Sequence, residues 1–393
     1  MRASADVVII GGGCMGTSVA YHLARRGVTD VVLVERAPRL GMGSTGRNAG
    51  GVRHQFSHEA NVRLSIESIR FFEHFAEEVG TEIDFHQDGY LFLLSSDEHV
   101  ERFRRSVEMQ RRLGVDVDWL TPSEAERLAP GLRVDGVIAA TFCPRDGIAD
   151  PHGVTHGFAR AARAAGIDIC RHTEVLNINV QGGRIVSVET SAGTIGTPVV
   201  VNATGPWARR IGQMVGLDIP VLPYRRHIFI ARPMGETSHP EVAQAWEVPD
   251  SRIMVIDFET TFYFHREGPG ILFGMSDPDE PPGFDMTVNW AFLEKVTPVA
   301  VRRLPALAHA GVQRAWAGLY EVTPDAMPII GPAPHIEGFF MINGFSGHGF
   351  QHSPAAGRIL ADLICGRSPG MDITPFAYER FLKGEGESEI QVV

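Results

Sequence analysis

The sequence predicts an α/β fold made of two interleaved domains, and three observations lead to this prediction. The chain has 393 residues, which is more than a single hydrophobic core usually serves. Its N-terminal part alternates between strand and helix patterns around a glycine turn, and this alternation returns after Asp150. Residues 220–275 instead show mostly alternating strands, and no repeat, low-complexity segment or linker separates the regions. Each domain is therefore expected to combine several chain segments.

The N-terminal elements follow a βαβ pattern. The stretch DVVIIGGGCMGTSVAYHLARRG predicts a buried strand over residues 6–10, a glycine turn and a helix that ends near Gly27. DVVLVER predicts the second strand of the unit. A long amphipathic helix is expected over residues 58–79, with Ser57 as its N-cap.

The later elements are predicted from caps and turns. GYLFLLSS predicts a strand, DEHVERFRRSVEMQRRLG a charged surface helix, and Thr121, Pro122 and Glu124 a capping box that opens a short helix. Asp150 and Pro151 open another helix, and an apolar strand over residues 199–202 runs into ATGPWA. RRHIFIARP and GILFGM predict strands, residues 289–304 a helix, and GFFMINGFSGHGFQHSPAAGRILADLICG a strand, a glycine turn and a helix.

Composition excludes several classes of protein. The formal net charge is −11 and no run of lysine and arginine interrupts it, which argues against nucleic-acid binding. Cys14, Cys143, Cys170 and Cys365 lie far apart without metal-like spacing, so we expect reduced cysteines and no metal site. The first apolar run leads into a glycine turn rather than a cleavage site, and no apolar stretch is long enough to span a bilayer. A cytoplasmic location is therefore expected.

Gly11, Gly13 and Gly16 form a GxGxxG turn between the first strand and its helix. In this context the first glycine permits the turn, the second lets the backbone approach a pyrophosphate, and the third packs helix on strand. Glu35 ends the next strand, where its carboxylate can accept hydrogen bonds from ribose hydroxyls. NAD and FAD share this half of the cofactor. We favour FAD because there is no second GxGxxG, while glycine-rich turns at 43–51 and 344–349 suit a longer cofactor.

The stretch GSTGRNAGGVRHQFS, residues 43–57, has four glycines and two arginines six positions apart. It is either a solvated surface loop or backbone that wraps an anionic cofactor while one arginine reaches a second negative group. A guanidinium such as that of Arg53 binds a carboxylate bidentately, which would position an amino-acid substrate. GFSGHGFQHSP has a similar pair of interpretations: a strand-to-helix turn, or a helix N-terminus directed at the cofactor ring where negative charge collects on reduction.

Together the N-terminal unit, STGRNAGGVR and GFSGHGF resemble the FAD-dependent amino-acid oxidase superfamily. They are most similar to its branch of sarcosine oxidases, dimethylglycine dehydrogenases and dye-linked proline dehydrogenase beta subunits. The resemblance implies a glutathione-reductase-like FAD-binding Rossmann domain, residues 1–80, 141–217 and 320–393. It also implies an interleaved α+β antiparallel-sheet substrate domain, residues 81–140 and 218–319. The reaction it implies is hydride transfer from the carbon next to nitrogen in a small secondary amino acid, followed by hydrolysis of the imine.

The resemblance also implies roles for individual residues. Arg53 would pair with the substrate carboxylate, beside Gln351, while His348 would lie near flavin or substrate. Tyr263 resembles a substrate-side tyrosine, or else belongs to the protein core. The implied cofactor-binding residues are Gly11, Gly12, Gly13, Met15, Gly16, Glu35, Arg36, Ser44, Thr45, Arg47, Asn48, Ala49, Gly50, Val175, Ala203, Gly205, Gly344, Gly347, His348, Gly349, Phe350 and Gln351.

Three positions depart from the monomeric sarcosine oxidases. Gln351 replaces a lysine that helps to hold the carboxylate, which weakens the prediction of sarcosine itself as substrate. Leu272 stands where those oxidases carry an oxygen-activating lysine, which favours a dehydrogenase. Gly318 stands where they carry the flavin-linked cysteine, so FAD is expected to be noncovalent.

Several alternatives stay open at this point. Electrons could pass to O2 or to another acceptor, and the chain could be the catalytic beta-like subunit of a heteromeric amino-acid dehydrogenase. A flavin-binding assembly or scaffold protein without turnover is an alternative of another class. A nicotinamide-dependent dehydrogenase is the weakest of them.

Overall fold

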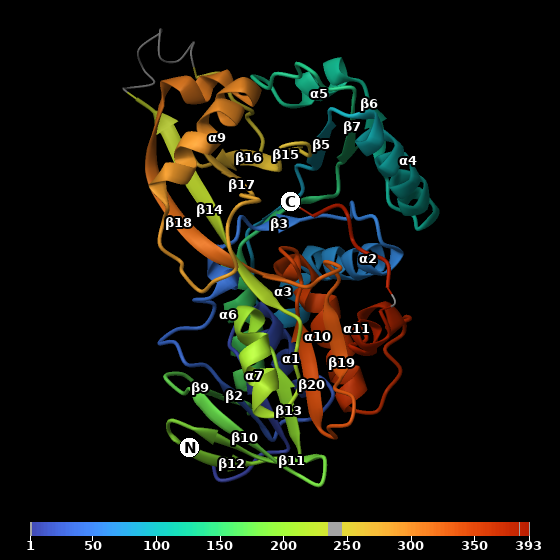
Figure 1. Cartoon of the computed structure of the whole chain (residues 1–393), viewed down its shortest axis with the longest axis vertical. Coiled ribbons are helices and arrows are strands. Elements are labelled where there is room, and N and C mark those ends of the chain that lie inside the picture. The colour runs from blue at the N-terminus through green and yellow to red at the C-terminus, as the bar shows by residue number, and fades with distance from the viewer. Residues whose placement is uncertain (1, 235–245, 385, 393) are drawn as a thin grey trace.

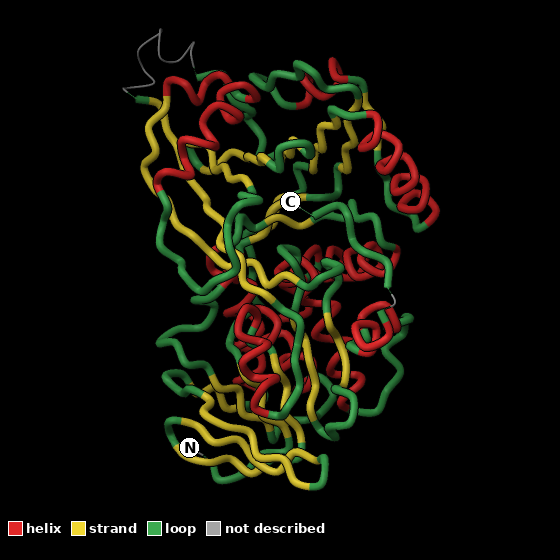
Figure 2. The backbone as a smooth tube through the Cα atoms, viewed as in Figure 1, coloured by secondary structure: helices red, strands yellow, loops and turns green. Residues whose placement is uncertain are grey.

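The computed structural model describes residues 2–234, 246–384 and 386–392 of the chain. The molecule is elongated, with one large sheet in each half (Figure 1). Helices and further strands surround both sheets, and long segments connect the halves more than once (Figure 2). The predicted α/β fold with a Rossmann-like half and a second sheet-containing half is confirmed.

The sheet nearer the N-terminus has six strands in the order β19-β20-β13-β1-β2-β9. All neighbours are parallel except β19 and β20, which are antiparallel. The strands are β1 (Val7–Ile10), β2 (Val31–Val34), β9 (Asp168–Cys170), β13 (Val199–Asn202), β19 (Ile329–Pro332) and β20 (Phe339–Asn343). The predicted βαβ unit is β1, α1 (Cys14–Ala24) and β2.

Both faces of this sheet are covered, which explains why its strands are apolar throughout. Val7 and Ile9 pack in the core that contains α1, α6 (Pro151–Ala164) and α10 (Gly349–Ile364). Val8 and Ile10, on the other face, pack beneath α7 and a three-stranded antiparallel sheet. These covering elements are α7 (Ala208–Met214), β10 (Val175–Gln181), β11 (Arg184–Thr190) and β12 (Gly193–Gly196).

The second large sheet has eight strands in the order β18-β14-β17-β16-β15-β5-β7-β6. Only β15 and β5 are parallel neighbours in it. Its strands are β5 (Tyr90–Leu94), β6 (Asp118–Leu120), β7 (Ala139–Cys143), β14 (Leu222–Pro233), β15 (Met254–Asp257), β16 (Phe262–Glu267), β17 (Gly270–Met275) and β18 (Ala310–Val322). One face packs on α9 (Trp290–Arg303) and α5 (Pro122–Leu128), and the other faces the first half.

A small sheet of three strands, β3-β8-β4, lies between the two halves. The remaining elements are β3 (Gly51–Val52), β4 (Phe85–His86), β8 (Gly147–Ala149), α2 (Glu59–Glu73), α3 (Phe75–Val79), α4 (Asp97–Arg112), α11 (Glu379–Lys383) and the short 3-10 helices η1 (Ser44–Arg47), η2 (Gly205–Trp207), η3 (Pro305–His309) and η4 (Thr374–Phe376). In the part of the chain described, no helix has the length and apolar character that crossing a membrane requires. The domain boundaries given above stay predictions.

The expected single helix over residues 58–79 is wrong in two respects. It breaks at His74 into α2 and α3, and the break turns the Phe75 ring toward that of Phe158, 5.1 Å away between centroids. Its N-cap is His58 and not Ser57. Nδ1 of His58 accepts the Ala60 N–H at 3.1 Å. The capping box at Thr121 and the Asp150 cap are confirmed.

Candidate functional site

A cavity of about 500 Å³ lies between the two large sheets. The first half contributes the β1–α1 turn, the loop of residues 41–53, the segment after β13 and the turn before α10. The second half contributes residues of the eight-stranded sheet, including Ile228 of β14, Met254 and Ile256 of β15, and residues 318–321 of β18. The cavity therefore joins the predicted dinucleotide turn to the predicted substrate residues.

The dinucleotide turn is closely packed. Gly11 has φ +110°, and a Cβ there would lie 2.4 Å from the Ala203 carbonyl oxygen. A Cβ on Gly16 would lie 1.9 Å from the Gly11 oxygen, so Gly16 packs α1 on the turn and does not line the cavity. Gly13 is the N-cap of α1 and has no side chain to cap it, while the Thr45 hydroxyl accepts the Cys14 N–H at 3.2 Å. The helix N-terminus borders the cavity, where its partial positive charge would stabilise an anion.

Glu35 is fixed at the end of β2 by backbone N–H groups. Its carboxylate accepts hydrogen bonds from Gly12 at 2.7 Å and from Ala37 at 2.8 Å, and it lines the cavity. Beside it the Arg36 guanidinium lies 4.0 Å from the centre of the Trp207 ring. Both side chains line the cavity, and Trp207 was not anticipated from the sequence. This end presents an acceptor for hydroxyls next to an aromatic surface.

The loop of residues 43–51 is attached to β18. The Ser44 hydroxyl donates to the Leu319 carbonyl at 2.6 Å, and Arg47 Nη1 donates to the Ala317 carbonyl at 2.8 Å. A Cβ on Gly318 would lie 3.0 Å from the Arg47 Cβ, so the close approach of loop and strand favours glycine at position 318. Arg47 thus lines the cavity and also joins the two halves.

The predicted substrate residues Arg53, Tyr263, His348 and Gln351 line one part of the cavity, called the substrate end below. The Arg53 side chain is buried. Its Nη2 donates to the Gln391 carbonyl at 2.5 Å, and Nη1 donates to the Gln55 carbonyl. The guanidinium lies 3.8 Å from the centre of the Phe56 ring, an arrangement that favours a cation. Burial lowers the pKa of Arg53, but arginine stays protonated at neutral pH.

Gln351 lies beside Arg53 at the first turn of α10. Its Oε1 accepts the Arg53 backbone N–H at 2.8 Å, whereas its buried Nε2 has no hydrogen-bond partner among the described residues. Burying an amide N–H group without a partner costs about 1–3 kcal/mol. Since Gln351 lines the cavity, a ligand oxygen is the natural partner for this N–H group.

His348 also lines the cavity, and it belongs to a buried hydrogen-bonded chain. Its Nε2 donates to the Ala326 carbonyl at 3.1 Å, and its Nδ1 lies 3.2 Å from Nδ1 of His352. His352 Nε2 lies 2.9 Å from the Ser65 hydroxyl. The contacts with Ala326 and His352 occupy both ring nitrogens of His348. Burial lowers the pKa of His348 to about 4, so the ring is neutral at pH 7. His348 is therefore poorly placed to accept a proton from a substrate.

An aromatic wall faces this end from the second sheet, formed by Tyr90, Tyr263 and Tyr320. A Cβ on Gly274 would lie 2.5 Å from the Tyr263 hydroxyl, and one on Gly51 would lie 1.7 Å from the Tyr90 hydroxyl. Two glycines thus make room for two of these side chains. Tyr263 lines the cavity and also packs against two apolar clusters, so its role at the substrate stays a prediction.

Several cavity residues escaped the sequence analysis. Arg226 lies 5.3 Å from the centre of the Tyr320 ring, and Glu321 accepts the Gly344 N–H at 3.1 Å. Burial raises the pKa of Glu321 to about 7. The available signal was the two-residue period of the strands, which places Arg226 and Ile228 on one face of β14 and Tyr320 on the matching face of β18.

Three expected cofactor residues do not line the cavity: Gly16, Gly50 and Gly344. Gly50 has φ +79°, with the Ala149 carbonyl where a Cβ would stand. Gly344 has φ +74°, with Thr323 in that position. Both shape the turns whose neighbours reach the cavity. The other expected catalytic and cofactor residues all line it.

Leu272 belongs to an apolar cluster with Ile228 and Ile230, against which Ala49 and Tyr263 pack. The position that the sequence analysis matched to an oxygen-activating lysine is thus a buried apolar side chain, which packs near the 43–51 loop and does not line the cavity.

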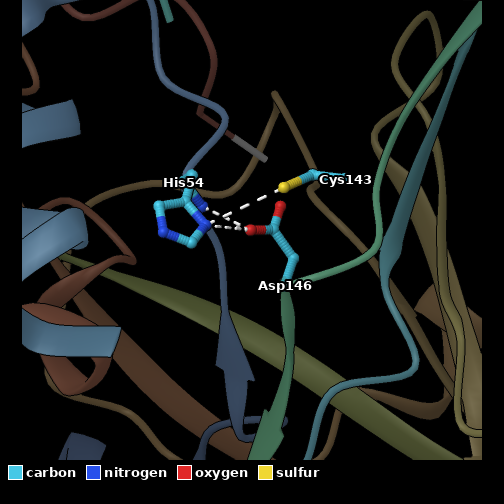
Figure 3. A group of neighbouring side chains, drawn as sticks. All are labelled: His54, Cys143 and Asp146. Atoms are coloured by element: carbon cyan, nitrogen blue, oxygen red, sulfur yellow. Dashed lines mark hydrogen bonds and ion pairs between the residues drawn. The ribbon is translucent and has the colours of Figure 1, made fainter. Parts of the chain in front are cut away.

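His54, Cys143 and Asp146 form a buried cluster, and His54 directly follows Arg53 in the chain (Figure 3). Asp146 Oδ1 accepts the His54 backbone N–H and lies near His54 Nδ1, both at 2.7 Å, and Oδ2 accepts from Gln55 Nε2 at 3.2 Å. Burial raises the pKa of the Cys143 thiol far above its ordinary value, so the thiol keeps its proton. Through Asp146, the cluster fixes the backbone that follows Arg53.

Comparisons with known proteins identify the family. A family model described as FAD dependent oxidoreductase matches residues 6–363. Among curated proteins, the chain is 32% identical to FAD-dependent oxidoreductase domain-containing protein 1 of Xenopus laevis, covering 99% of this chain and 85% of the relative. It is 31% identical to mitochondrial dimethylglycine dehydrogenase of Rattus norvegicus, covering 96% of this chain but 45% of that protein.

Two solved structures extend the comparison. L-proline dehydrogenase from P. horikoshii superposes with a TM-score of 0.88 at 36% identity, covering 98% of this chain and 100% of that one. Glycine oxidase from Geobacillus kaustophilus superposes with a TM-score of 0.83 at 27% identity, covering 96% and 98%. The resemblance inferred from the sequence motifs is confirmed, and FAD is the cofactor.

The residues of the cavity fit FAD. The N-terminus of α1 lines the cavity where a pyrophosphate would bind, with Gly13 as its N-cap and the Thr45 hydroxyl on the Cys14 N–H. A Cβ on Gly13 would lie 3.0 Å from that hydroxyl. Glu35 supplies the acceptor for a ribose, and the 43–51 loop and the turn before α10 supply backbone along the rest of the cavity.

Proposed function

Because the chain belongs to the FAD-dependent oxidoreductase family, we propose that it oxidises the carbon–nitrogen bond of a small secondary amino acid. The substrate is an N-methyl amino acid of the sarcosine type, or proline. The C–H bond next to nitrogen breaks and its electron pair leaves with the hydrogen as hydride, which FAD accepts. Nitrogen loses a proton, a C=N bond forms, and water then adds to the imine.

One observation supports this proposal above the others: a buried guanidinium and an unpartnered amide N–H group lie together at the substrate end. Arg53 supplies the charge for a carboxylate, and Gln351 supplies a neutral donor beside it. A primary or secondary amino acid held in this way has its α-carbon placed reproducibly, and positioning is most of what hydride transfer requires of a protein.

The other groups set the state of the amine. The reaction requires an unprotonated nitrogen, because a lone pair must form the C=N bond. The positive charge of Arg53 and the tyrosine wall, which excludes water, both lower the pKa of a bound ammonium group. With His348 neutral and occupied on both nitrogens, we propose that no protein base is needed for this step.

For the electron acceptor we propose a molecule other than O2. At the position of the oxygen-activating lysine the chain has a buried apolar side chain, Leu272, so the cation that would stabilise superoxide-like charge at this position is missing. The similarity to an L-proline dehydrogenase along the full length of both chains supports the same choice. It also supports a second candidate, the catalytic beta-like subunit of a heteromeric amino-acid dehydrogenase.

The test is an anaerobic titration of the purified holoprotein with sarcosine, other N-methyl amino acids, L-proline and primary D-amino acids, followed at the flavin absorbance. Bleaching by a secondary amino acid is expected, and Arg53→Ala should lower kcat/KM about 100-fold or more, since it removes one partner of a buried charge pair. Arg105→Ala is the matched control, because Arg105 is an exposed residue of α4.

Readmitting air distinguishes the acceptors: recolouring over minutes supports a dehydrogenase, and recolouring within seconds supports an oxidase. A flavin that no amino acid on the panel bleaches would refute the proposal. The scaffold alternative, which binds FAD without turnover, would then be preferred.

A further inference from the structure

The C-terminal strap, defined here as residues 389–392, lies beyond α11 and reaches the cavity at the end that contains Arg53. Beyond α11 the chain runs past the end of α2, and its C-terminal end lies at the level of β3, between the two halves (Figure 1). Glu389 and Gln391 are 2% and 1% exposed, although this part of the chain forms no helix or strand. A segment without regular structure that buries two polar residues must be held by specific contacts.

Glu389 provides those contacts. Its carboxylate accepts hydrogen bonds from the Ser57 N–H at 2.9 Å, the His58 N–H at 3.0 Å and Asn61 Nδ2 at 3.0 Å. The Ser57 hydroxyl adds a further bond at 2.5 Å. Burial acts to raise the pKa of Glu389, but these hydrogen bonds outweigh it and lower the pKa below its ordinary value. The carboxylate thus attaches the strap to the start of α2.

The strap then contacts the residue proposed to bind the substrate. The Gln391 carbonyl accepts the hydrogen bond from Arg53 Nη2 at 2.5 Å, and the Gln55 carbonyl accepts one from Nη1. An arginine has five N–H donors in a rigid plane, so two backbone acceptors fix the plane and direction of the guanidinium. Positioning of Arg53 therefore depends on a segment more than three hundred residues away in the sequence.

Val392 follows directly and lines the same cavity as Arg53, Gln351 and Tyr90. It is an apolar group in the same lining as these polar and aromatic residues, so it occupies space that the part of the substrate that is neither carboxylate nor amine would need. The Gln391 side-chain amide is buried, and among the described residues its Oε1 and Nε2 have no hydrogen-bond partner. The same is true of Nε2 of Gln351.

We propose that the strap is a specificity-determining part of the substrate site: the Gln391 carbonyl positions the Arg53 guanidinium, and Val392 limits the size of the amino acid accepted. This inference rests on the function proposed above. It narrows the substrate class to amino acids whose apolar part is as small as that of sarcosine or proline. Larger N-alkyl or ring substituents meet Val392.

Two kinds of variant test it in the holoprotein. Val392→Gly enlarges the site. It should raise kcat/KM for pipecolate about tenfold relative to proline, and kcat/KM for an N-butyl amino acid about tenfold relative to sarcosine. Val392→Phe should lower both of these ratios. Glu389→Ala releases the strap and should raise KM at least tenfold with a smaller change in kcat, because binding is weakened more than chemistry. Glu387→Ala is the matched control, an exposed carboxylate just before the strap.

A readout without turnover accompanies these assays. Tetrahydrofuran-2-carboxylate keeps the carboxylate and ring of proline but has oxygen in place of the amine, so it binds without reaction. We expect it to perturb the flavin spectrum with a Kd that rises at least tenfold in Glu389→Ala, and to slow hydrogen exchange of residues 389–392 in the wild type. Unchanged selectivity in both Val392 variants, together with an unchanged Kd in Glu389→Ala, would overturn the inference.

The two proposals fail differently. If no secondary amino acid bleaches the wild-type flavin and the carboxylate ligand does not bind, the function proposed above fails. If the wild type is active and binds the ligand but the strap variants behave like it, only the strap inference fails. Ser57→Ala, which removes one hydroxyl contact of Glu389, provides a milder release should Glu389→Ala lose its fold.

Discussion

Replacing Asp146 by asparagine tests whether the buried cluster of His54, Cys143 and Asp146 holds Arg53 and Gln55 in position. Asp146 Oδ1 bonds the His54 backbone N–H and lies at hydrogen-bonding distance from His54 Nδ1, and Oδ2 accepts from Gln55 Nε2. An asparagine retains only one oxygen. In the more favourable orientation this oxygen keeps its two contacts with His54, and the new NH2 group faces the Gln55 amide. One hydrogen bond is lost, and the two that remain lose the negative charge of their acceptor.

The magnitude follows from these three bonds. Leaving the Gln55 N–H without a partner costs about 1–3 kcal/mol, and each of the two others weakens by about 1 kcal/mol when its acceptor becomes neutral. The sum is about 4 kcal/mol. With an unfolding entropy of about 2.1 cal/mol/K per residue, a chain of 393 residues loses about 5 °C of Tm if it melts as one unit, and more if the affected half melts alone.

The assay is thermal unfolding of the holoprotein followed by circular dichroism, alongside KM for the best substrate. We expect the Tm to fall by about 5 °C and KM to rise several-fold, because Gln55 also accepts a bond from Arg53 through its carbonyl. Asp116→Asn is the control, since Asp116 is exposed. A variant that melts within 1 °C of the wild type with the same KM would refute the supporting role of the cluster.

Three further predictions concern other residues of the cavity. Glu35→Gln should weaken FAD binding about tenfold or more, measured by flavin release, because the amide loses one of the two backbone hydrogen bonds and the negative charge of the acceptor. Gly347→Ala should lower flavin content and activity, because φ is +97° and the new Cβ would lie 2.4 Å from the Tyr320 ring; normal flavin content would contradict this. Burial raises the pKa of Glu321 from 4.5 to about 7, so the folded state holds a proton that the unfolded state releases. Glu321 therefore imposes no penalty below pH 4.5, and its penalty grows to at most about 3 kcal/mol above pH 7. The fall in Tm between pH 5 and pH 8 should be smaller in Glu321→Gln, and an equal fall would show that the carboxyl ionises normally.

Several turns and helix starts could be predicted from local patterns. The glycines of the β1–α1 turn, the carboxylate that ends β2 and the caps at Thr121 and Asp150 all act over a few residues, so their spacing along the chain is sufficient. The break at His74 could not be predicted in this way. It depends on the packing of Phe75 against Phe158, which come together only when α3 meets α6.

The substrate end shows the same division. The sequence alone determined the family, the cofactor and four of the residues that line this end: Arg53, Tyr263, His348 and Gln351. Tyr90, Arg226 and Tyr320 reach the cavity because three strands distant in sequence present matching faces in one sheet, and a two-residue period does not reveal which face meets the other half. Only the tertiary structure brings the 389–392 strap onto Arg53, since contacts that bury Glu389 and Gln391 leave no periodicity in an irregular segment.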